Sequence, residues 1–177
     1  RLAFLAFLLL IAFVGLIVQK IWTVSPPGFN PIIRVSGLDL AQAWSLKRTA
    51  ERAMQSGQFE TANYGWRAAI ANNPADPDAV RGLLRFTLAT ATGTNKATSS
   101  GTLGQVGWLL RLTQTNQNDV ALAARVVDAL KLYELALNLL APREPSLTPE
   151  LKAIFLRALF ETDRIAEFGS RWKRDRG

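Results

Sequence analysis

The side chains best suited to catalysis are scarce in this chain of 177 residues. Histidine and cysteine are both absent, which removes thiolate nucleophiles, disulfides, most zinc sites and the usual proton shuttle at neutral pH. Two neighbouring carboxylates could serve as general acid and base, and Asp76 and Asp78 are a candidate pair. However, Asp76 stands directly before Pro77, an order typical of a helix start. Helix capping therefore accounts for both carboxylates.

The other candidate motifs for catalysis are equally weak. Glu134, Glu144 and Glu150 are dispersed over predicted loops and polar helix faces. The segment GTLGQVG, residues 101–107, is rich in glycine but lacks the Lys-Ser/Thr ending of a phosphate-binding loop and follows no predicted strand. We therefore predict no catalytic residue, no cofactor and no metal site, and we expect that the protein is not an enzyme.

Positive charge is the second chemical feature, since the formal net charge is +7. The C-terminal segment SRWKRDRG holds cations that could contact anionic lipid, with a solvated helix end as the alternative: Arg171, Lys173, Arg174 and Arg176. Nucleic-acid binding is not expected, because it would need a longer basic surface with exposed aromatic residues. Polysaccharide binding would also need exposed aromatic side chains. Trp44 and Trp108 are the candidates, and we expect both in the core.

The N-terminal segment is the most apolar part of the chain. Residues 2–18 carry no charged or strongly polar side chain, and residues 21–24 extend the apolar run past Gln19 and Lys20. At a rise of about 1.5 Å per residue, roughly 20 helical residues cross the hydrocarbon core of a bilayer. We predict a transmembrane anchor over residues 1–24. A buried core helix and a cleaved signal peptide are the alternatives, but there is no polar face and no small-x-small cleavage site.

This anchor predicts the localisation. We expect a single-pass membrane protein, typically of the bacterial inner membrane, with the rest of the chain held at the bilayer surface. Few Lys and Arg residues flank the apolar run, so the positive-inside rule does not decide its orientation. The periplasmic side is favoured because single N-terminal anchors commonly carry exported domains.

A short tether and a helical domain follow the apolar run. Residues 25–37 contain three prolines and two glycines and predict an extended tether. Residues 38–177 are rich in Ala, Leu, Arg, Glu and Gln, which favours helices. We predict helices over residues 40–55, 59–71, 77–90, 103–114, 119–140 with a break near Asp128, from 149 onward, and over 165–172. The segment rich in Thr, Ser and Gly at 91–102 predicts a flexible loop.

One stretch of this domain shows a regular spacing of small and aromatic residues. The pattern is a small residue in one helix, Gly-x-aromatic at a turn, then Ala, an aromatic, Ala and Pro in and after the next helix. It is carried by Ala50, Gly57, Phe59, Ala62, Trp66, Ala69 and Pro74. This spacing resembles that of the tetratricopeptide repeat (TPR), a helix-turn-helix unit of about 34 residues. The alternative is a generic helical bundle.

The residues fit the packing that the resemblance implies. Ala62 and Ala69 lie seven residues apart on one helix face, so a partner helix can approach closely, and Trp66 between them would fill the groove toward a neighbour. Gly57 permits the left-handed turn conformation, while Pro74 ends the second helix. The expected fold is all-α: a single N-terminal transmembrane helix followed by a TPR-like α-solenoid.

The resemblance also implies a function. Helical-repeat arrays bind other proteins on a concave surface formed by the first helix of each pair. In this sequence that face implies the following candidate binding residues: Gln42, Lys47, Arg48, Arg81 and Arg85. By resemblance, an anchored protein of this kind is a scaffold in a bacterial envelope assembly, such as polysaccharide synthesis or secretion machinery, with a membrane protein among its partners. The alternative is a permanent accessory subunit of a larger membrane complex.

Overall fold

The structure is a computed structural model that describes residues 2–23, 33–91 and 96–176. Helices dominate the described residues, so the prediction of an all-α fold class is confirmed, apart from two short strands. In chain order the elements are α1 (Leu2–Val18), β1 (Lys20–Thr23), β2 (Ile33–Ser36), α2 (Gly37–Gln55), α3 (Phe59–Asn72), α4 (Pro77–Thr90), α5 (Lys96–Leu112), α6 (Gln117–Ala129), α7 (Tyr133–Leu140), the 3₁₀ helix η1 (Ala141–Ser146), α8 (Pro149–Glu161) and α9 (Ile165–Arg176).

The N-terminal segment differs from its prediction. The apolar helix α1 ends at Val18 after 17 residues, and β1 begins two residues later. A helix of this length spans about 25 Å, short of the roughly 30 Å of a bilayer core. Among the described residues, every helix falls short of the combination of length and apolar composition that a bilayer span requires. The predicted transmembrane anchor over residues 1–24, and with it the single-pass localisation, is therefore wrong.

Two further segments differ from the sequence-based expectation. Lys20–Thr23 pairs with Ile33–Ser36 as an antiparallel hairpin, so the last part of the predicted tether is a strand. The remainder of that tether, residues 25–32, lies outside the described residues. The predicted loop at 91–102 is also shortened, because α5 begins at Lys96. Ser, Thr and Gly are weak helix formers, so local composition did not reveal this helix.

The chain forms two compact units. The first contains residues 1–83 and 111–114, and the second contains residues 84–110 and 115–177. The division falls within α4 and α5, so each of these helices contributes to both units. The two units are described separately below.

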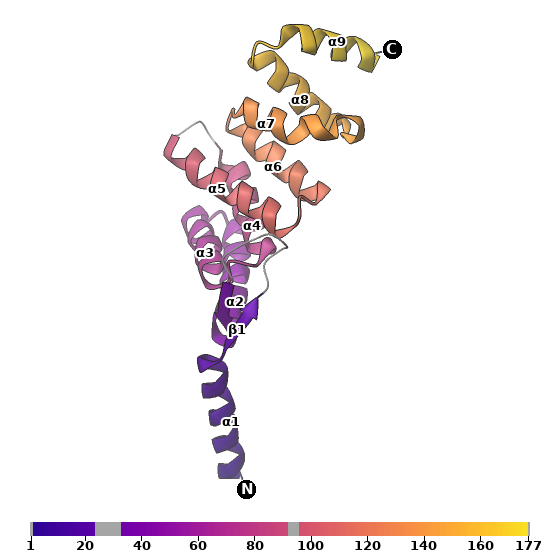
Figure 1. Ribbon diagram of the computed structural model, residues 1–177. Coiled ribbons are helices and arrows are strands. Elements are labelled where there is room, and N and C mark those ends of the chain that lie inside the picture. Colours follow the sequence, from indigo (N-terminus) through magenta and orange to yellow (C-terminus); the bar gives the residue numbers. More distant parts are fainter. Residues whose placement is uncertain (1, 24–32, 92–95, 177) are drawn as a thin grey trace. The chain divides into compact units, whose positions relative to one another are not determined.

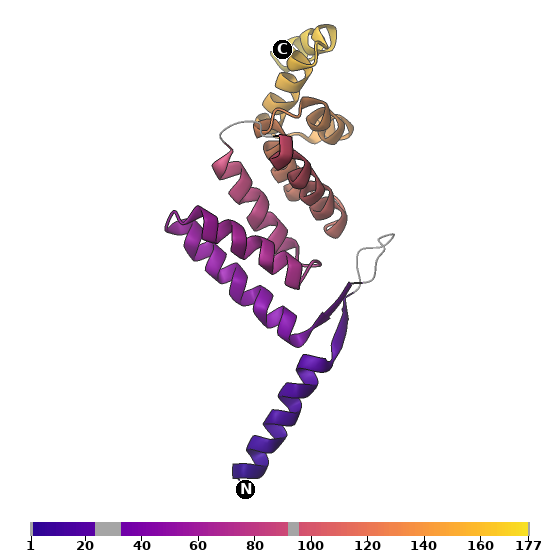
Figure 2. The ribbon, with the colours of Figure 1, turned by 90° about the vertical axis from the view of Figure 1, so that its left-hand side faces the viewer.

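The first unit is built on an antiparallel pair, α2 and α3, which lie side by side in Figure 2. Ser36 begins α2 with a capping box: its Oγ accepts from the Asp39 N–H at 3.2 Å, and the Asp39 carboxylate accepts from the Ser36 N–H at 2.7 Å. The two helices approach closely because small residues meet where they cross. A Cβ atom added to Gly65 would lie only 2.8 Å from the Cβ of Ala50.

Trp66 fills the space between α3 and α4 in this unit, as its place in the pattern predicts. Its side chain is 6% exposed, and its six-membered ring lies over Gly82. A Cβ atom at Gly82 would lie 2.5 Å from two carbons of the indole ring. Gly82 is therefore the residue that allows α4 to pack against Trp66.

The second unit contains an extensive cluster of buried apolar side chains. Leu140 and Leu159 are among its fully buried side chains. The cluster joins one face of α6 and α7 to the buried face of α8, and its members are Val120, Ala124, Val127, Ala136, Leu137, Leu140, Leu147, Leu151, Ile154, Phe155, Ala158 and Leu159. Thr148 caps α8 through its Oγ1, and Pro149 takes the first helical position, as predicted.

The same turn joins three helix pairs: α2–α3, α6–α7 and α8–α9. Its middle residue has a positive φ in each case, 72° at Gly57, 56° at Lys131 and 58° at Asp163. The following N–H returns to a carbonyl five residues earlier, in the bonds Gln58→Ala53 (2.8 Å), Leu132→Val127 (2.8 Å) and Arg164→Leu159 (2.9 Å). These bonds define a Schellman motif, which satisfies carbonyls at the end of the first helix. The three pairs therefore share one local design.

This shared turn predicts that introducing glycine at Lys131 or Asp163 stabilises the protein and that removing the glycine at position 57 destabilises it. The left-handed conformation costs an L-amino acid roughly 1 kcal/mol, and glycine avoids this cost. We therefore expect Lys131→Gly and Asp163→Gly each to raise the free energy of unfolding by about 0.5–1 kcal/mol, and Gly57→Ala to lower it by a similar amount. Urea denaturation followed by circular dichroism would measure all three. Equal effects of glycine at Lys131 and at the helical position Lys152 would contradict the explanation.

Candidate interaction surfaces

Of the binding residues implied on α2, two are engaged within the first unit. Gln42 is exposed. Lys47 is ion-paired, with its Nζ 2.6 Å from a carboxylate oxygen of Asp76. The Arg48 guanidinium lies 4.1 Å from the centre of the Trp44 ring, a cation–π contact.

Arg81 and Arg85 lie one turn apart on α4. Arg81 binds Asp78 at 2.6 Å in the first turn of the helix, and Arg85 is exposed. The two residues fall in different units. The described contacts therefore do not join the five implied binding residues into one cluster.

The expectation that Trp44 is in the core is wrong. The side chain is 55% exposed, because α2 buries the face that carries Ala43, Ala50 and Ala53, and Trp44 lies off that face. Trp108 is half-buried. The exposed aromatic and cationic pair of Trp44 and Arg48 is thus a surface feature of the first unit.

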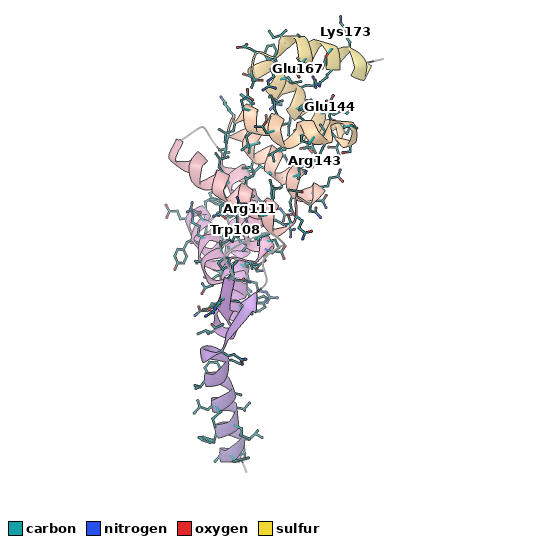
Figure 3. The ribbon with its side chains drawn as sticks, in the orientation of Figure 1. Trp108, Arg111, Arg143, Glu144, Glu167 and Lys173 are labelled. Atoms are coloured by element: carbon teal, nitrogen blue, oxygen red, sulfur yellow. The ribbon has the colours of Figure 1, made fainter. Side chains whose placement is uncertain are left out.

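The C-terminal cations are less available than the sequence suggested. Arg171 is half-buried and donates to Glu144 at 3.1 Å and to Glu167 at 3.0 Å; both acidic residues are labelled in Figure 3. Burial alone would lower the pKa of Arg171, but its contacts with these two carboxylates raise it. Lys173 is exposed, while the side chains of Arg174 and Arg176 lie outside the described part. The predicted lipid contact therefore loses Arg171.

Ion pairs connect successive helix pairs in the second unit. Arg125 of α6 binds Glu150 of α8 through two bonds, at 2.8 and 2.7 Å, and this hydrogen bonding lowers the pKa of Glu150. Arg164, at the turn before α9, binds Glu134 of α7 at 3.0 Å. Each pair is largely exposed and contributes little stability, but together they fix which side chains meet between neighbouring helices.

Asp128 on α6 has a different environment. Its Oδ2 accepts from Arg157 at 2.8 Å, but its Oδ1 is buried and accepts no hydrogen bond from the described residues. Burial raises the pKa of Asp128, and the attraction of Arg157 only partly offsets this effect. The charged carboxylate is therefore less favourable in the folded state than in the unfolded chain.

This raised pKa predicts a pH dependence of stability. The pKa of an aspartate in the unfolded chain is near 3.9, and the folded state holds the Asp128 proton more strongly than this. The protonated side chain therefore contributes stability at low pH, and this contribution is lost as the pH rises through the pKa of Asp128 in the folded state. We therefore expect the free energy of unfolding of Asp128→Asn, relative to that of the wild type, to rise as the pH increases from about 3 to about 7. The rise should be about 1.4 kcal/mol for each tenfold by which the folded state binds the Asp128 proton more tightly than the unfolded chain. Urea denaturation across this range would measure it. The exposed Glu60→Gln is the control, and a difference independent of pH would contradict the assignment.

A groove of about 610 Å³ lies on the surface of the α8–α9 pair. Its lining is mainly apolar and includes Leu147, Lys152, Ala153, Leu156, Phe168 and Trp172. Phe168 and Trp172 stack with ring centres 5.9 Å apart, and Phe160 meets the edge of Phe168 at the same separation. Trp172 remains 41% exposed. The groove is thus a surface of large apolar side chains that the second unit leaves open to solvent.

A smaller hollow of about 400 Å³ lies beside the α6–α7 turn. Leu103, Leu132, Tyr133 and Leu135 provide most of its surface, with Lys131 and Glu134 at its edge. Burial raises the pKa of Tyr133, so the phenol stays neutral. No group of metal-ligating side chains occurs among the described residues. Its chemistry is suited to apolar contact.

The groove was not identified from the sequence. A helix over residues 165–172 was expected, and Phe168 and Trp172 lie four residues apart within it, on one helix face. That spacing was a usable signal for an apolar face. Its openness depends on what packs against α8 and α9, which local sequence does not show. Comparisons with protein-family models, curated proteins and solved structures found no match to this chain.

Proposed function

We propose that this protein is a TPR-like helical-repeat scaffold that binds another protein. The observation that carries the proposal is the recurrence of one helix-turn-helix design, with the same left-handed turn at Gly57, Lys131 and Asp163. Arrays of such pairs act as binding surfaces because each pair buries one face against its neighbours and leaves another open.

The α6–α7 pair supports this proposal, because it repeats the spacing of the first pair. In the first pair, Ala50, Phe59, Ala62 and Trp66 stand at fixed distances from Gly57. Counted from Lys131, the same distances lead to Ala124, Tyr133, Ala136 and Leu140. The small residues at both crossings, and Leu140, are fully buried. The Gly of the pattern is replaced by Lys131, which adopts the same backbone conformation.

The character of the exposed surfaces also supports binding of a protein. The first unit presents Trp44 with Arg48 stacked on it, and aromatic and Arg side chains are enriched where proteins bind one another. The second unit presents the α8–α9 groove. Both surfaces combine apolar area with charge at the edge.

Affinity purification of the full-length protein after brief chemical crosslinking, followed by mass spectrometry, tests the proposal. We expect a reproducible partner whose recovery falls at least about fivefold in a Trp44→Ala, Trp172→Ala double variant. Tyr64→Ala, which removes an exposed aromatic side chain from α3, is the matched control. Equal recovery with all three proteins, or no partner at all, would count against a scaffold.

A permanent accessory subunit is the second candidate. The observation that favours it is α1, whose large apolar side chains at residues 2–16 are mostly about half exposed or more. Permanent interfaces bury extended apolar surfaces of this kind. Exchange of isotope-labelled protein into the purified assembly separates the two candidates, because a scaffold exchanges within minutes and a permanent subunit does not.

A further inference from the structure

The groove on α8 and α9 has an equivalent on the α6–α7 pair of the same unit, where the equivalent positions are buried. Asp163 follows Lys131 by 32 residues at the equivalent turn position. The same step of 32 residues relates four positions on the α6–α7 pair to four positions on the α8–α9 pair. It takes Val120, Ala124, Ala136 and Leu140 to Lys152, Leu156, Phe168 and Trp172, respectively.

The first four residues belong to the cluster that holds α8, and the second four line the groove. The α6–α7 pair therefore buries this set of positions in the core that α8 completes. The equivalent set on the α8–α9 pair is only partly covered: Lys152, Leu156 and Phe168 are half-buried, and Trp172 is exposed. Trp172 replaces Leu140, and it is 41% exposed where Leu140 is fully buried.

A charged residue at the edge of the groove also has an equivalent on α6. The same step takes Arg125 to Arg157, which borders the groove. Arg125 binds Glu150 in the first turn of α8, and so it fixes the start of the helix seated on α6–α7. Arg157 already binds Asp128, but a guanidinium carries five N–H donors. Arg171 shows in this unit that one guanidinium can bind two carboxylates.

We infer that the groove binds an amphipathic α-helix of the partner protein, with an acidic residue in its first turn, at the place that α8 takes on the α6–α7 pair. The apolar face of that helix lies on Ala153, Leu156, Phe168 and Trp172, and its carboxylate binds Arg157. This inference rests on the proposed function, because it assigns the chemistry of the partner that the scaffold binds. It is helix-in-groove recognition, in which apolar residues at helical spacing provide the contact.

The structure favours a different protein over a second copy of this chain. A helix that fits must combine an apolar face with an acidic first turn, and α8 itself has this pattern, with Glu150 and Leu151. Its apolar face is already buried in the core of the second unit. A second copy could offer α8 only by breaking that core. The exposed helix α1 has no acidic residue in its first turn and so does not match. Helix α9 has Glu167 there, but Glu167 already binds Arg171, and Phe168 and Trp172 of α9 line the groove itself.

A synthetic peptide with the sequence of residues 148–163 serves as the probe, because it carries the required pattern. Fluorescence anisotropy of the labelled peptide, titrated with the full-length protein, measures its affinity. We expect saturable binding with a dissociation constant in the micromolar range. Ala153→Glu places a charge on the groove surface without removing a core contact and should weaken binding at least about tenfold. Ala166→Glu, at an exposed position on α9 outside the groove, is the matched control.

The outcomes separate the inference from the proposed function. Loss of binding in Ala153→Glu but not in Ala166→Glu, with a weaker affinity for a peptide carrying Lys in place of Glu150, supports the inference. No saturable binding up to about 1 mM, or equal weakening by both variants, overturns it. Self-association of the wild type that Ala153→Glu abolishes would make the occupant a second copy and also overturn it. A partner recovered equally with wild type and Ala153→Glu leaves the scaffold standing while the groove assignment fails.

Discussion

Replacing Gly82 by alanine is expected to lower the free energy of unfolding by about 2 kcal/mol, although alanine is the better helix former. The added methyl group would lie 2.5 Å from the Trp66 ring, and the buried indole has little room to move. Forcing an extra carbon into a packed core costs about 1–3 kcal/mol, which exceeds the gain in helix propensity of up to about 1 kcal/mol. Urea denaturation followed by circular dichroism would measure the difference.

Gly107→Ala is the matched control for this prediction. Gly107 also lies within a helix, but nothing comes within 4 Å of the position of an added Cβ. The same substitution there should raise stability by about 0.5–1 kcal/mol. Replacing Trp66 by leucine in the same chain as Gly82→Ala should recover part of the loss, since the ring that obstructs the methyl group is gone. Purely additive effects of the two substitutions would contradict direct contact.

Leu159→Ala is expected to destabilise the second unit by about 2–5 kcal/mol. The side chain is 1% exposed in the cluster that joins α6, α7 and α8, and truncation of a buried leucine leaves a cavity. Because the chain divides into two units, we expect faster amide hydrogen exchange in residues 115–176 and unchanged exchange in α2 and α3. Hydrogen exchange with mass spectrometry would map the effect.

The neighbouring residue provides the control for Leu159→Ala. Phe160 is 56% exposed and meets the edge of the Phe168 ring. Phe160→Ala should cost about 1 kcal/mol or less, despite removing a larger side chain. If Leu159→Ala also accelerated exchange in the first unit, the two units would unfold together, and the division of the chain would have no consequence for stability.

Local chemistry was sufficient to predict most helix boundaries. Cap and proline signals located the starts of α4 at Pro77 and α8 at Pro149, and α3 follows the turn at Gly57 as expected. The break predicted near Asp128 is confirmed, because α6 ends at Ala129. The equivalent turn residue there is Lys131, whose left-handed conformation has no sequence signal of its own. The second instance of the repeat spacing was therefore missed.

Features that depend on tertiary packing were not predictable from the sequence. The strand Lys20–Thr23 follows an apolar run and gains its structure by pairing with residues 33–36. The importance of Gly82 depends on the position of Trp66, and a glycine within a helix has many possible explanations. The α8–α9 groove exists because no other described helix covers these side chains. Sequence periodicity identifies an apolar helix face but does not show whether another helix covers it.

The three Schellman turns also have a consequence for the rate of folding. Every hydrogen bond that defines these turns spans at most five residues, so each turn can form before any distant part of the chain is ordered. A transition state that already contains the turns would make folding fast for a chain of this length. In that case substitutions at Lys131 and Asp163 would change mainly the folding rate, whereas Leu159→Ala would change mainly the unfolding rate. The short segments between paired helices would then decide how quickly the helix pairs assemble.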